Sequence, residues 1–358
     1  MVATTAFTTG DGITLENLRR FAGWAIERAQ TAMDTMAPAV RLALPRLEVS
    51  LYTQNTGYAE LARQRLSQAG AGTDRGEPCR ILVTSPGIDG MMAPPGWGDE
   101  LFHSRRFEEA LSGTAFRAEF DHGLRFWQIF DIRRNIGVQW MQSERAYPPW
   151  EPGSPLRVFL HWFYSARGMR LAHAGTLGKN GKGVLLVGRG GSGKSGSVVD
   201  GVLAGLQTVG DDYVLLDHGG GFPMAFPVFR TFKQDAGGLR RLGLYDAIRA
   251  GREPNWQGKY EFFSEDIDGV AMTPSLEIRA LLVPHLVEQQ HSELSAVSRA
   301  RAMLALAPSG LFQMPGERDS GVTRFAELVR SLPCFGLSLG HDRAALSQVI
   351  GDFLDGVA

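Results

Sequence analysis

Hydrophobic positions spaced three and four residues apart predict helices near both ends of the chain. The first predicted helix runs over about 15–33 and places Leu18, Phe21 and Ile26 on one face. Similar spacing predicts further helices over 58–69, 156–164, 195–206, 295–304, 322–332 and 343–354. The chain is therefore expected to carry helices throughout its length.

Strand patterns lie between these helices. Residues 115–142 alternate between apolar and polar positions in the manner of antiparallel strands, with Trp127, Phe130 and Trp140 on the buried side. Shorter apolar runs predict strands over 80–84, 183–187 and 278–286, and a strand interrupted by proline over 42–52. Segments 71–78 and 86–98 contain the glycine and proline that are typical of loops.

Domain organisation follows from length and from one connector. A chain of 358 residues suits two domains, and the proline-dense segment 147–155 is the expected boundary. Residues 1–150 are expected to form a mixed α+β domain that recognises or positions a substrate, because they show no catalytic constellation. Residues 151–358 alternate strands and helices, which predicts an α/β domain.

Composition and charge limit the functional classes to which the chain can belong. The chain is 44% hydrophobic and 21% charged, as in ordinary globular proteins, and its net charge of −1 gives no general basic field for nucleic acid or an anionic membrane. Cys79 and Cys334 have neither metal-ligand nor disulfide spacing, which favours a reducing compartment. The N-terminus has no signal-peptide pattern and no apolar run approaches membrane-spanning length, so a cytoplasmic protein is expected.

The main candidate for chemistry is the segment Gly-Arg-Gly-Gly-Ser-Gly-Lys-Ser at 188–195. It matches the P-loop (Walker A) pattern G-x-x-x-x-G-K-[ST], follows an apolar run and precedes a predicted helix. In a P-loop, backbone N–H groups surround the phosphates, the lysine reaches the β- and γ-phosphates, and the serine holds Mg²⁺. A chance glycine turn is the alternative, and the complete context disfavours it. The candidate nucleotide-binding residues are Gly188, Gly190, Gly191, Ser192, Gly193, Lys194, Ser195 and Gly196.

Lysine usage supports the same interpretation. The chain has five lysines, all within 179–259, and arginine carries every other positive side-chain charge. Lysine is the compact point charge that a phosphate loop uses, and Lys194 occupies that position. For Lys179 and Lys182 we favour compositional drift.

A pair of carboxylates and a histidine complete the candidate site. Asp211 and Asp212 follow the predicted P-loop helix at the point where the chain returns toward the P-loop strand. Two adjacent carboxylates could divide the work of phosphoryl transfer, one facing Mg²⁺ and the other facing the acceptor hydroxyl. A Gly-Asp-Asp turn is the alternative. His173, which precedes the loop by fifteen residues, would by itself be an ordinary strand histidine.

The spacing of these landmarks resembles the HPr serine kinase/phosphorylase family, whose nucleotide domain is related to phosphoenolpyruvate carboxykinase. The resemblance covers residues 171–216 and implies an HPr-kinase-like nucleotide-binding domain over 151–358 that uses ATP and Mg²⁺. It also implies that Asp211 is the base, that Asp212 assists Mg²⁺, and that His173 lies near the transferred phosphate. Family members form oligomers, so a homo-oligomer is compatible with this resemblance.

Two departures separate the chain from the main family. Gly196 stands where the family has glutamate, and the Glu-Ile-Arg-Gly motif is absent after the aspartate pair, since Glu277–Arg279 lies too late. These departures argue against a reverse phosphorylase reaction and against HPr as the acceptor. Several phrases are instead similar to a divergent branch that includes lasso-peptide serine kinases. They are 153–157, 173–175, 210–213, 229–233, 306–309 and 332–335.

The sequence thus predicts an ATP-dependent kinase that transfers the γ-phosphate to a hydroxyl, with a serine of a peptide or small protein as the expected acceptor. Arg230 and Lys233 are candidates for phosphate or acceptor contacts, with a solvated basic stretch as the alternative. Two other functions stay open, namely a kinase for a small-molecule alcohol and a nucleotide-sensing adaptor without catalysis. Neither nucleic acid nor a membrane is an expected partner.

Overall fold

The computed structural model describes residues 14, 17–66, 77–87, 90, 91, 104–121, 123–219, 221–267, 270, 272–311, 314–316 and 318–357. These residues form two compact units. The first contains the described residues up to Gln64, those from Glu77 to Ala166, and Pro315 and Gly316. The second contains Arg65, Leu66 and the described residues of Arg167–Met314 and Arg318–Val357.

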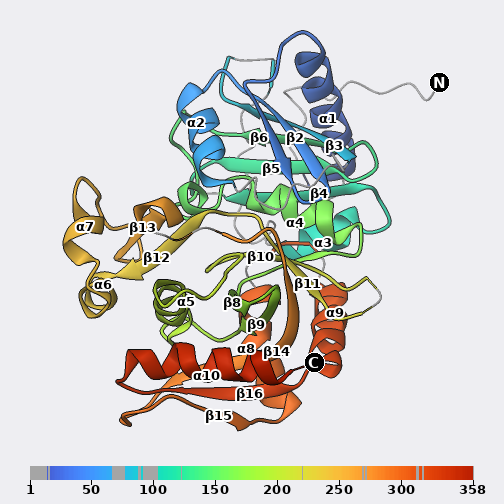
Figure 1. Cartoon of the computed structure of the whole chain (residues 1–358). Coiled ribbons are helices and arrows are strands. Elements are labelled where there is room, and N and C mark those ends of the chain that lie inside the picture. Colours follow the sequence, from blue (N-terminus) through green and yellow to red (C-terminus); the bar gives the residue numbers. More distant parts are fainter. Residues whose placement is uncertain are drawn as a thin grey trace. The chain divides into compact units, whose positions relative to one another are not determined.

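The first unit is a sheet with helices on its faces (Figure 1). Its elements are α1 (Leu18–Asp34), β1 (Val40–Leu44), β2 (Leu47–Tyr52), α2 (Thr56–Arg65, ending at the unit boundary), β3 (Glu77–Thr84), α3 (Ser104–Leu111), β4 (Phe116–Asp121), β5 (Phe126–Asp131), β6 (Ile136–Trp140) and α4 (Arg157–Ser165). Among the described residues the strand order is β1-β2-β3-β6-β5-β4, with β2, β3 and β6 parallel. The segment expected as one interrupted strand is a hairpin, β1–β2, that turns at Pro45 and Arg46.

Helices α1 and α4 pack on opposite faces of this sheet. Leu18, Phe21 and Ile26 of α1 are fully buried in a cluster with Trp127 and Ile129 of β5, which confirms the predicted first helix. The alternate residue Phe130 points to the other face, where its ring packs against Phe159 and Trp162 of α4. Because of this aromatic packing α4 belongs to the first unit, so the unit boundary follows Ala166, one helix later than the boundary expected at residue 150.

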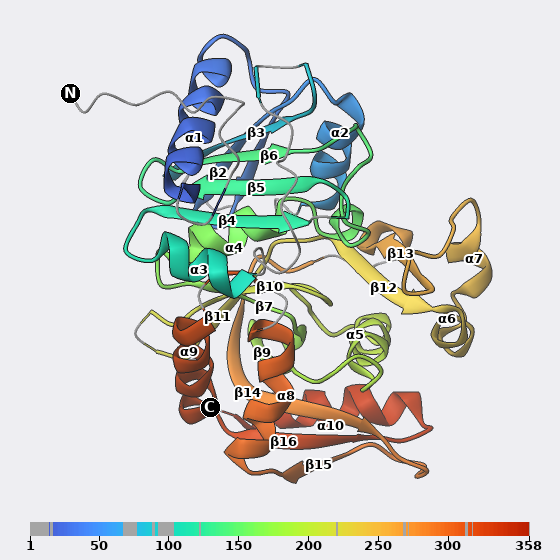
Figure 2. The same cartoon turned by 180° about the vertical axis from the view of Figure 1, so that it is seen from behind.

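The second unit is a larger mixed sheet with helices around it (Figure 2). Its elements are β7 (Arg170–Ala172), β8 (Gly175–Lys179), β9 (Lys182–Leu186), α5 (Lys194–Leu203), β10 (Val214–Asp217), β11 (Met224–Pro227), β12 (Thr231–Asp235), α6 (Ala236–Leu242), α7 (Tyr245–Arg249), β13 (Lys259–Phe263), β14 (Leu276–Leu286), β15 (Glu293–Ala296), α8 (Arg299–Leu311), α9 (Arg318–Ser331), β16 (Cys334–Leu339) and α10 (Arg343–Gly356). The chain is thus a mixed α/β protein with several sheets.

Strand β14 is a central strand of the sheet in the second unit. It pairs in parallel with β9 and β16 and antiparallel with β11. Its buried run includes Ile278, Leu281 and Leu282, which belong to hydrophobic clusters on the two sides of the sheet. A strand buried on both faces reads as a continuous apolar run, which is why 278–286 could be predicted as a strand. The carboxyl ends of β9, β14 and β16 therefore lie along one edge of the sheet.

None of the helices in the described part of the chain combines the length and the apolar character that a membrane span requires.

Candidate functional site

The glycine loop, which we define as Gly188–Ser195, leaves the carboxyl end of β9 and runs into α5. The N–H of Val187 donates to the carbonyl of Leu282 at 2.9 Å, which holds the start of the loop against β14. Gly191 and Gly193 have φ values of 80° and 98°, which favour glycine. A Cβ atom on Gly193 would stand 2.3 Å from Cδ1 of Leu339, so the end of β16 also requires glycine there.

The Lys194 side chain folds back onto the glycine loop. Its Nζ donates to the carbonyl of Gly188 at 2.7 Å, and the residue is only 6% exposed. Burial lowers the pKa of Lys194, the nearby Asp211 and Asp212 oppose that shift, and the ammonium group of Lys259 adds to it. The predicted phosphate-loop lysine is therefore in electrostatic reach of both predicted carboxylates.

Asp211 lies beside the first turn of α5. Its Oδ2 accepts the backbone N–H of Lys233 at 3.2 Å, and the residue is 2% exposed. Burial, followed by the charge of Asp212, raises the pKa of Asp211 to about 6, although the Lys233 N–H, the Ser195 hydroxyl and Lys194 all lower it. A carboxylate with such a pKa is suited to accept a proton near neutral pH.

Asp212 lies between two other groups. Its Oδ1 is 3.1 Å from Nε2 of His173, and its Oδ2 is 2.7 Å from Nζ of Lys233. Burial alone would raise the pKa of Asp212, but the Lys233 ammonium and the His173 ring outweigh burial and hold it well below its usual range. The two adjacent aspartates thus have opposite pKa shifts, which is the pattern expected of carboxylates with different roles.

Sheet register places His173 next to the acid pair. Strands β7 and β10 are antiparallel, and Ala172 faces Val214. His173, one residue past β7, therefore meets the residues that precede β10, and its ring lies 5.2 Å from that of Tyr213. The proximity of His173 to Asp212 follows from this pairing, whereas the resemblance implied only that His173 lies near the transferred phosphate.

A chain of alternating charges extends from Asp212 across the β12–β13 ribbon, which we define as the antiparallel pair 231–235 and 259–263. Lys233 on β12 lies opposite Glu261 on β13, with 4.0 Å between Nζ and Oε1. Glu261 also faces Arg65, with 3.4 Å between Oε2 and Nη2. Of the two basic residues singled out from the sequence, Lys233 thus joins the acid pair. Arg230 instead pairs with Glu265.

Several buried polar atoms around the glycine loop have no hydrogen-bond partner within the described residues. They include Oγ of Ser192, Oδ1 of Asp211 and Nδ1 of His173. Buried polar groups are nearly always satisfied in folded proteins, so these three atoms are candidates for contacts with a polar ligand. These atoms surround the loop and the acid pair.

The oxygen groups near the loop fit a hard divalent cation such as Mg²⁺. Ser195 and Asp211 lie close together, and Asp211 Oδ1 is unpartnered within the described residues. Both oxygens of Asp212 are engaged by His173 and Lys233, so the assignment of Asp212 to the metal stays a prediction. The described residues contain no cluster of three or more histidine, cysteine, aspartate or glutamate side chains able to hold a metal by themselves. Any Mg²⁺ here would depend on ligand oxygens as well.

Two residues near the site were not singled out from the sequence, namely Glu261 and Lys259. A signal for them was present. Lys233-Gln-Asp235 and Lys259-Tyr-Glu261 carry opposite charges at the positions that pair across the ribbon. Recognising that signal requires knowledge that two segments separated by α6 and α7 form one ribbon.

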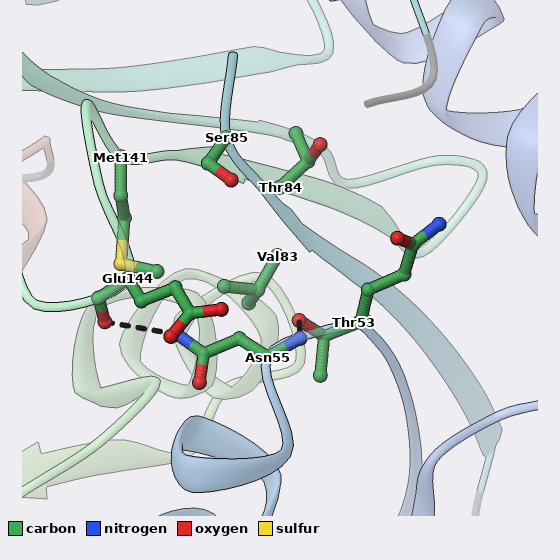
Figure 3. Close-up of a pocket in the computed structure, with 8 residues that line it drawn as sticks. Thr53, Asn55, Val83, Thr84, Ser85, Met141 and Glu144 are labelled. Atoms are coloured by element: carbon green, nitrogen blue, oxygen red, sulfur yellow. Dashed lines mark hydrogen bonds between the residues drawn. The ribbon is translucent and has the colours of Figure 1, made fainter. Parts of the chain in front are cut away.

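The first unit contains a separate cavity of about 130 Å³ (Figure 3). It lies at the carboxyl ends of the parallel strands β2, β3 and β6, where open α/β sheets commonly bind ligands. Asn55 crosses one side of it and donates to the carbonyl of Glu144 at 2.9 Å. The lining combines polar and apolar side chains and includes Thr53, Asn55, Val83, Thr84, Ser85, Met141 and Glu144.

Comparisons with known proteins show a distant structural likeness. No protein-family model matches the chain, and no curated protein matches it. The chain is similar to a solved structure of the Hpr(Ser) kinase/phosphatase from Coxiella burnetii, with 12% sequence identity and a TM-score of 0.26. The alignment covers 51% of this chain and 95% of that chain. At that TM-score the likeness does not identify a function for this chain.

Proposed function

We propose that the chain is an ATP-dependent kinase that requires Mg²⁺ and transfers the γ-phosphate to a hydroxyl. The observation that carries this proposal is the proximity of the glycine loop to the acid pair. Lys194 at the start of α5 interacts electrostatically with both Asp211 and Asp212, and the Ser195 hydroxyl lies close enough to Asp211 to lower its pKa. A phosphate-binding loop beside a carboxylate base is the arrangement that phosphoryl transfer requires.

The residues of the second unit divide the reaction between them. The N–H groups of the glycine loop and the Lys194 ammonium bind the phosphates, and bound Mg²⁺ at Ser195 would supply further positive charge to the phosphate oxygens. The acceptor oxygen forms a bond to the γ-phosphorus, the bond from phosphorus to the β–γ bridging oxygen breaks, and ADP leaves. Asp211, with a pKa of about 6, takes the hydroxyl proton.

Asp212 has a supporting role in this proposal. Its pKa is held low by Lys233 and His173, so it stays ionised next to Asp211 and raises the pKa of that neighbour. His173 and Lys233 fix its orientation from two sides. A carboxylate that stays charged raises the pKa of the carboxylate beside it. In this way Asp212 keeps Asp211 basic enough to take a proton near neutral pH.

We further propose that the acceptor is a serine of a peptide or small protein and that the first unit recognises it. The cavity at the carboxyl ends of β2, β3 and β6 offers hydroxyl and amide groups suited to a peptide. Cys79 and Cys334 are both free thiols, which is consistent with a cytoplasmic protein.

The experiment that tests the function follows radiolabel from [γ-³²P]ATP with Mg²⁺ into a library of serine-containing peptides and a matched library with alanine at each serine. Wild-type protein should label only the serine library. Lys194→Ala and Asp211→Asn should each reduce transfer by about 10²- to 10⁴-fold, while Asp211→Asn keeps its affinity for ATP within a few-fold. Full transfer by Asp211→Asn would remove the base assignment, and a wild-type protein that binds no ATP would remove the kinase proposal.

A further inference from the structure

Lys259 stands at the start of β13, on the face of the β12–β13 ribbon that Lys233 also occupies. In the antiparallel register Lys233 faces Glu261 and Asp235 faces Lys259. Successive residues of a strand alternate between faces, so Lys233 and Lys259 share one face as diagonal neighbours, about 7–8 Å apart at the backbone. The opposite face is fixed by Phe232 and Phe262, which stack in the hydrophobic cluster shared with α5.

This ribbon lies beside α5 in both views of the fold (Figure 1 and Figure 2). Gln234 of β12 approaches the first turn of α5 closely, because a Cβ on Gly196 would stand 3.3 Å from its Nε2. On the other face, the Lys233 side chain reaches Asp212, and Lys259 lies diagonally next to Lys233 on that same face. The ribbon therefore brings a second ammonium group to the side of the acid pair, next to the glycine loop.

Within the described residues, the Lys259 ammonium has no ion pair or hydrogen bond. The cross-strand carboxylate Asp235 uses its Oδ1 to accept the N–H of Gly238 at the start of α6, and Glu261 faces Arg65 and Lys233. The other four lysines have partners. Lys179 pairs with Asp355, Lys182 donates to the carbonyl of Val357, Lys194 donates to Gly188 and Lys233 pairs with Asp212.

An ammonium group without a carboxylate partner favours an anion beside it. Lys194 lies at the glycine loop and Lys259 lies on the acid-pair side of the ribbon, and Oγ of Ser192 in the loop lacks a partner within the described residues. A group with several negative oxygens accepts hydrogen bonds from both ammonium groups and from the Ser192 hydroxyl together. A terminal phosphate, with more charge than a bridging one, does so best.

We propose that Lys259 is a second phosphate-binding lysine, which contacts the terminal phosphate of a nucleoside triphosphate and makes the site select the triphosphate over the diphosphate. The proposal rests on the proposed function, because it places the γ-phosphate between Lys194 and the ribbon. Lys259 lies on the side of Lys233 and Asp212, where the acceptor hydroxyl would arrive. During transfer the Lys259 ammonium would remain close to the phosphoryl group as it moves to the acceptor. Lys259 would then have the role that an arginine has in other phosphoryl-transfer enzymes.

The test measures the dissociation constants of MgATP, MgADP and inorganic tripolyphosphate by calorimetry for the wild-type chain and for Lys259→Met. Lys259→Met should weaken MgATP and tripolyphosphate binding by about 10- to 100-fold and MgADP binding by less than about threefold. Lys259→Arg, which keeps the charge, should recover most of the loss. Lys179→Met removes the same charge from an exposed ion pair with Asp355 and should leave all three constants unchanged.

The outcomes separate this inference from the function beneath it. If the wild-type chain binds MgATP and Lys259→Met binds both nucleotides as the wild type does, the role of Lys259 is wrong and the kinase proposal stands. Equal weakening of MgATP and MgADP also overturns the triphosphate selectivity. A wild-type chain that binds neither nucleotide overturns both proposals. Thermal unfolding of each variant identifies misfolding, and if Lys259→Met is unfolded, Lys259→Gln decides by the same criteria.

Discussion

The Nζ atom of Lys233 lies 2.7 Å from Oδ2 of Asp212, and the two side chains are only 12% and 17% exposed. The backbone N–H of the same lysine donates to Asp211. One residue of β12 therefore contacts both members of the acid pair, and the position of the β12–β13 ribbon controls the geometry and the charge of the pair.

The Lys233–Asp212 pair should contribute to the free energy of unfolding, and the effects of replacing the two residues should not be additive. Lys233→Met leaves the Asp212 carboxylate with its charge partly uncompensated, so we expect the free energy of unfolding to fall by about 2 kcal/mol at pH 7. Asp212→Asn in the same chain should restore much of this loss, because the charge left unpaired is then absent. Urea unfolding of the two single variants and the double variant measures the coupling. Strict additivity would show that the two side chains do not interact in solution.

Asp211 should make the folded state less stable as the pH rises. Its folded pKa of about 6 lies above its ordinary value of 3.8, so the folded state binds more protons between these values. The stabilisation that protonated Asp211 provides is complete below about pH 4 and is lost as the pH rises through 6. Asp211→Asn removes this dependence and should gain stability relative to the wild type, on the order of 3 kcal/mol between pH 4 and pH 8.

Unfolding curves of the wild type and Asp211→Asn at pH 4, 6 and 8 measure this difference. Asp217→Asn is a matched control, since it removes a carboxylate from the end of β10, outside the acid pair. A constant difference between the wild type and Asp211→Asn at all three pH values would mean that the pKa of Asp211 is not raised in the folded protein.

Gly193 and Gly190 should respond differently to alanine. Gly193 has a φ of 98°, and a Cβ there would meet Leu339 at 2.3 Å, whereas a Cβ on Gly190 meets nothing within 4 Å. Gly193→Ala should therefore lower the free energy of unfolding by about 2 kcal/mol, and Gly190→Ala should change it by less than about 0.5 kcal/mol. Thermal and urea unfolding of the pair check this, and equal effects would contradict the described shape of the glycine loop.

The parts of the fold that could be predicted from sequence are those with strong local patterns. Helices α1, α9 and α10 follow from apolar spacing, and β4, β5 and β6 follow from alternation over 115–142. The glycine loop could be located because its sequence is constrained locally by backbone conformation. Its distance from the acid pair along the chain also indicated that the two would meet.

The parts that could not be predicted depend on partners far away in sequence. Ser295 was expected to begin a helix, and this is wrong, because Ser295 lies in β15 and pairs with Gly336 of β16. The β12–β13 ribbon was missed because its strands are mostly polar. Only the burial of Phe232 and Phe262 against α5 decides that they pair. Because the ribbon could not be predicted, the contact between Lys233 and Asp212 could not be predicted either.

Strand β14 joins β9 to β16, and Leu339 at the end of β16 packs against Gly193. The glycine loop is thus completed by residues that leave the ribosome long after the loop itself. A nascent chain that has exposed β9 and α5 still lacks β14, which holds the start of the loop, and Leu339, which covers its last glycine. We infer that this region reaches its final shape only when synthesis is nearly finished.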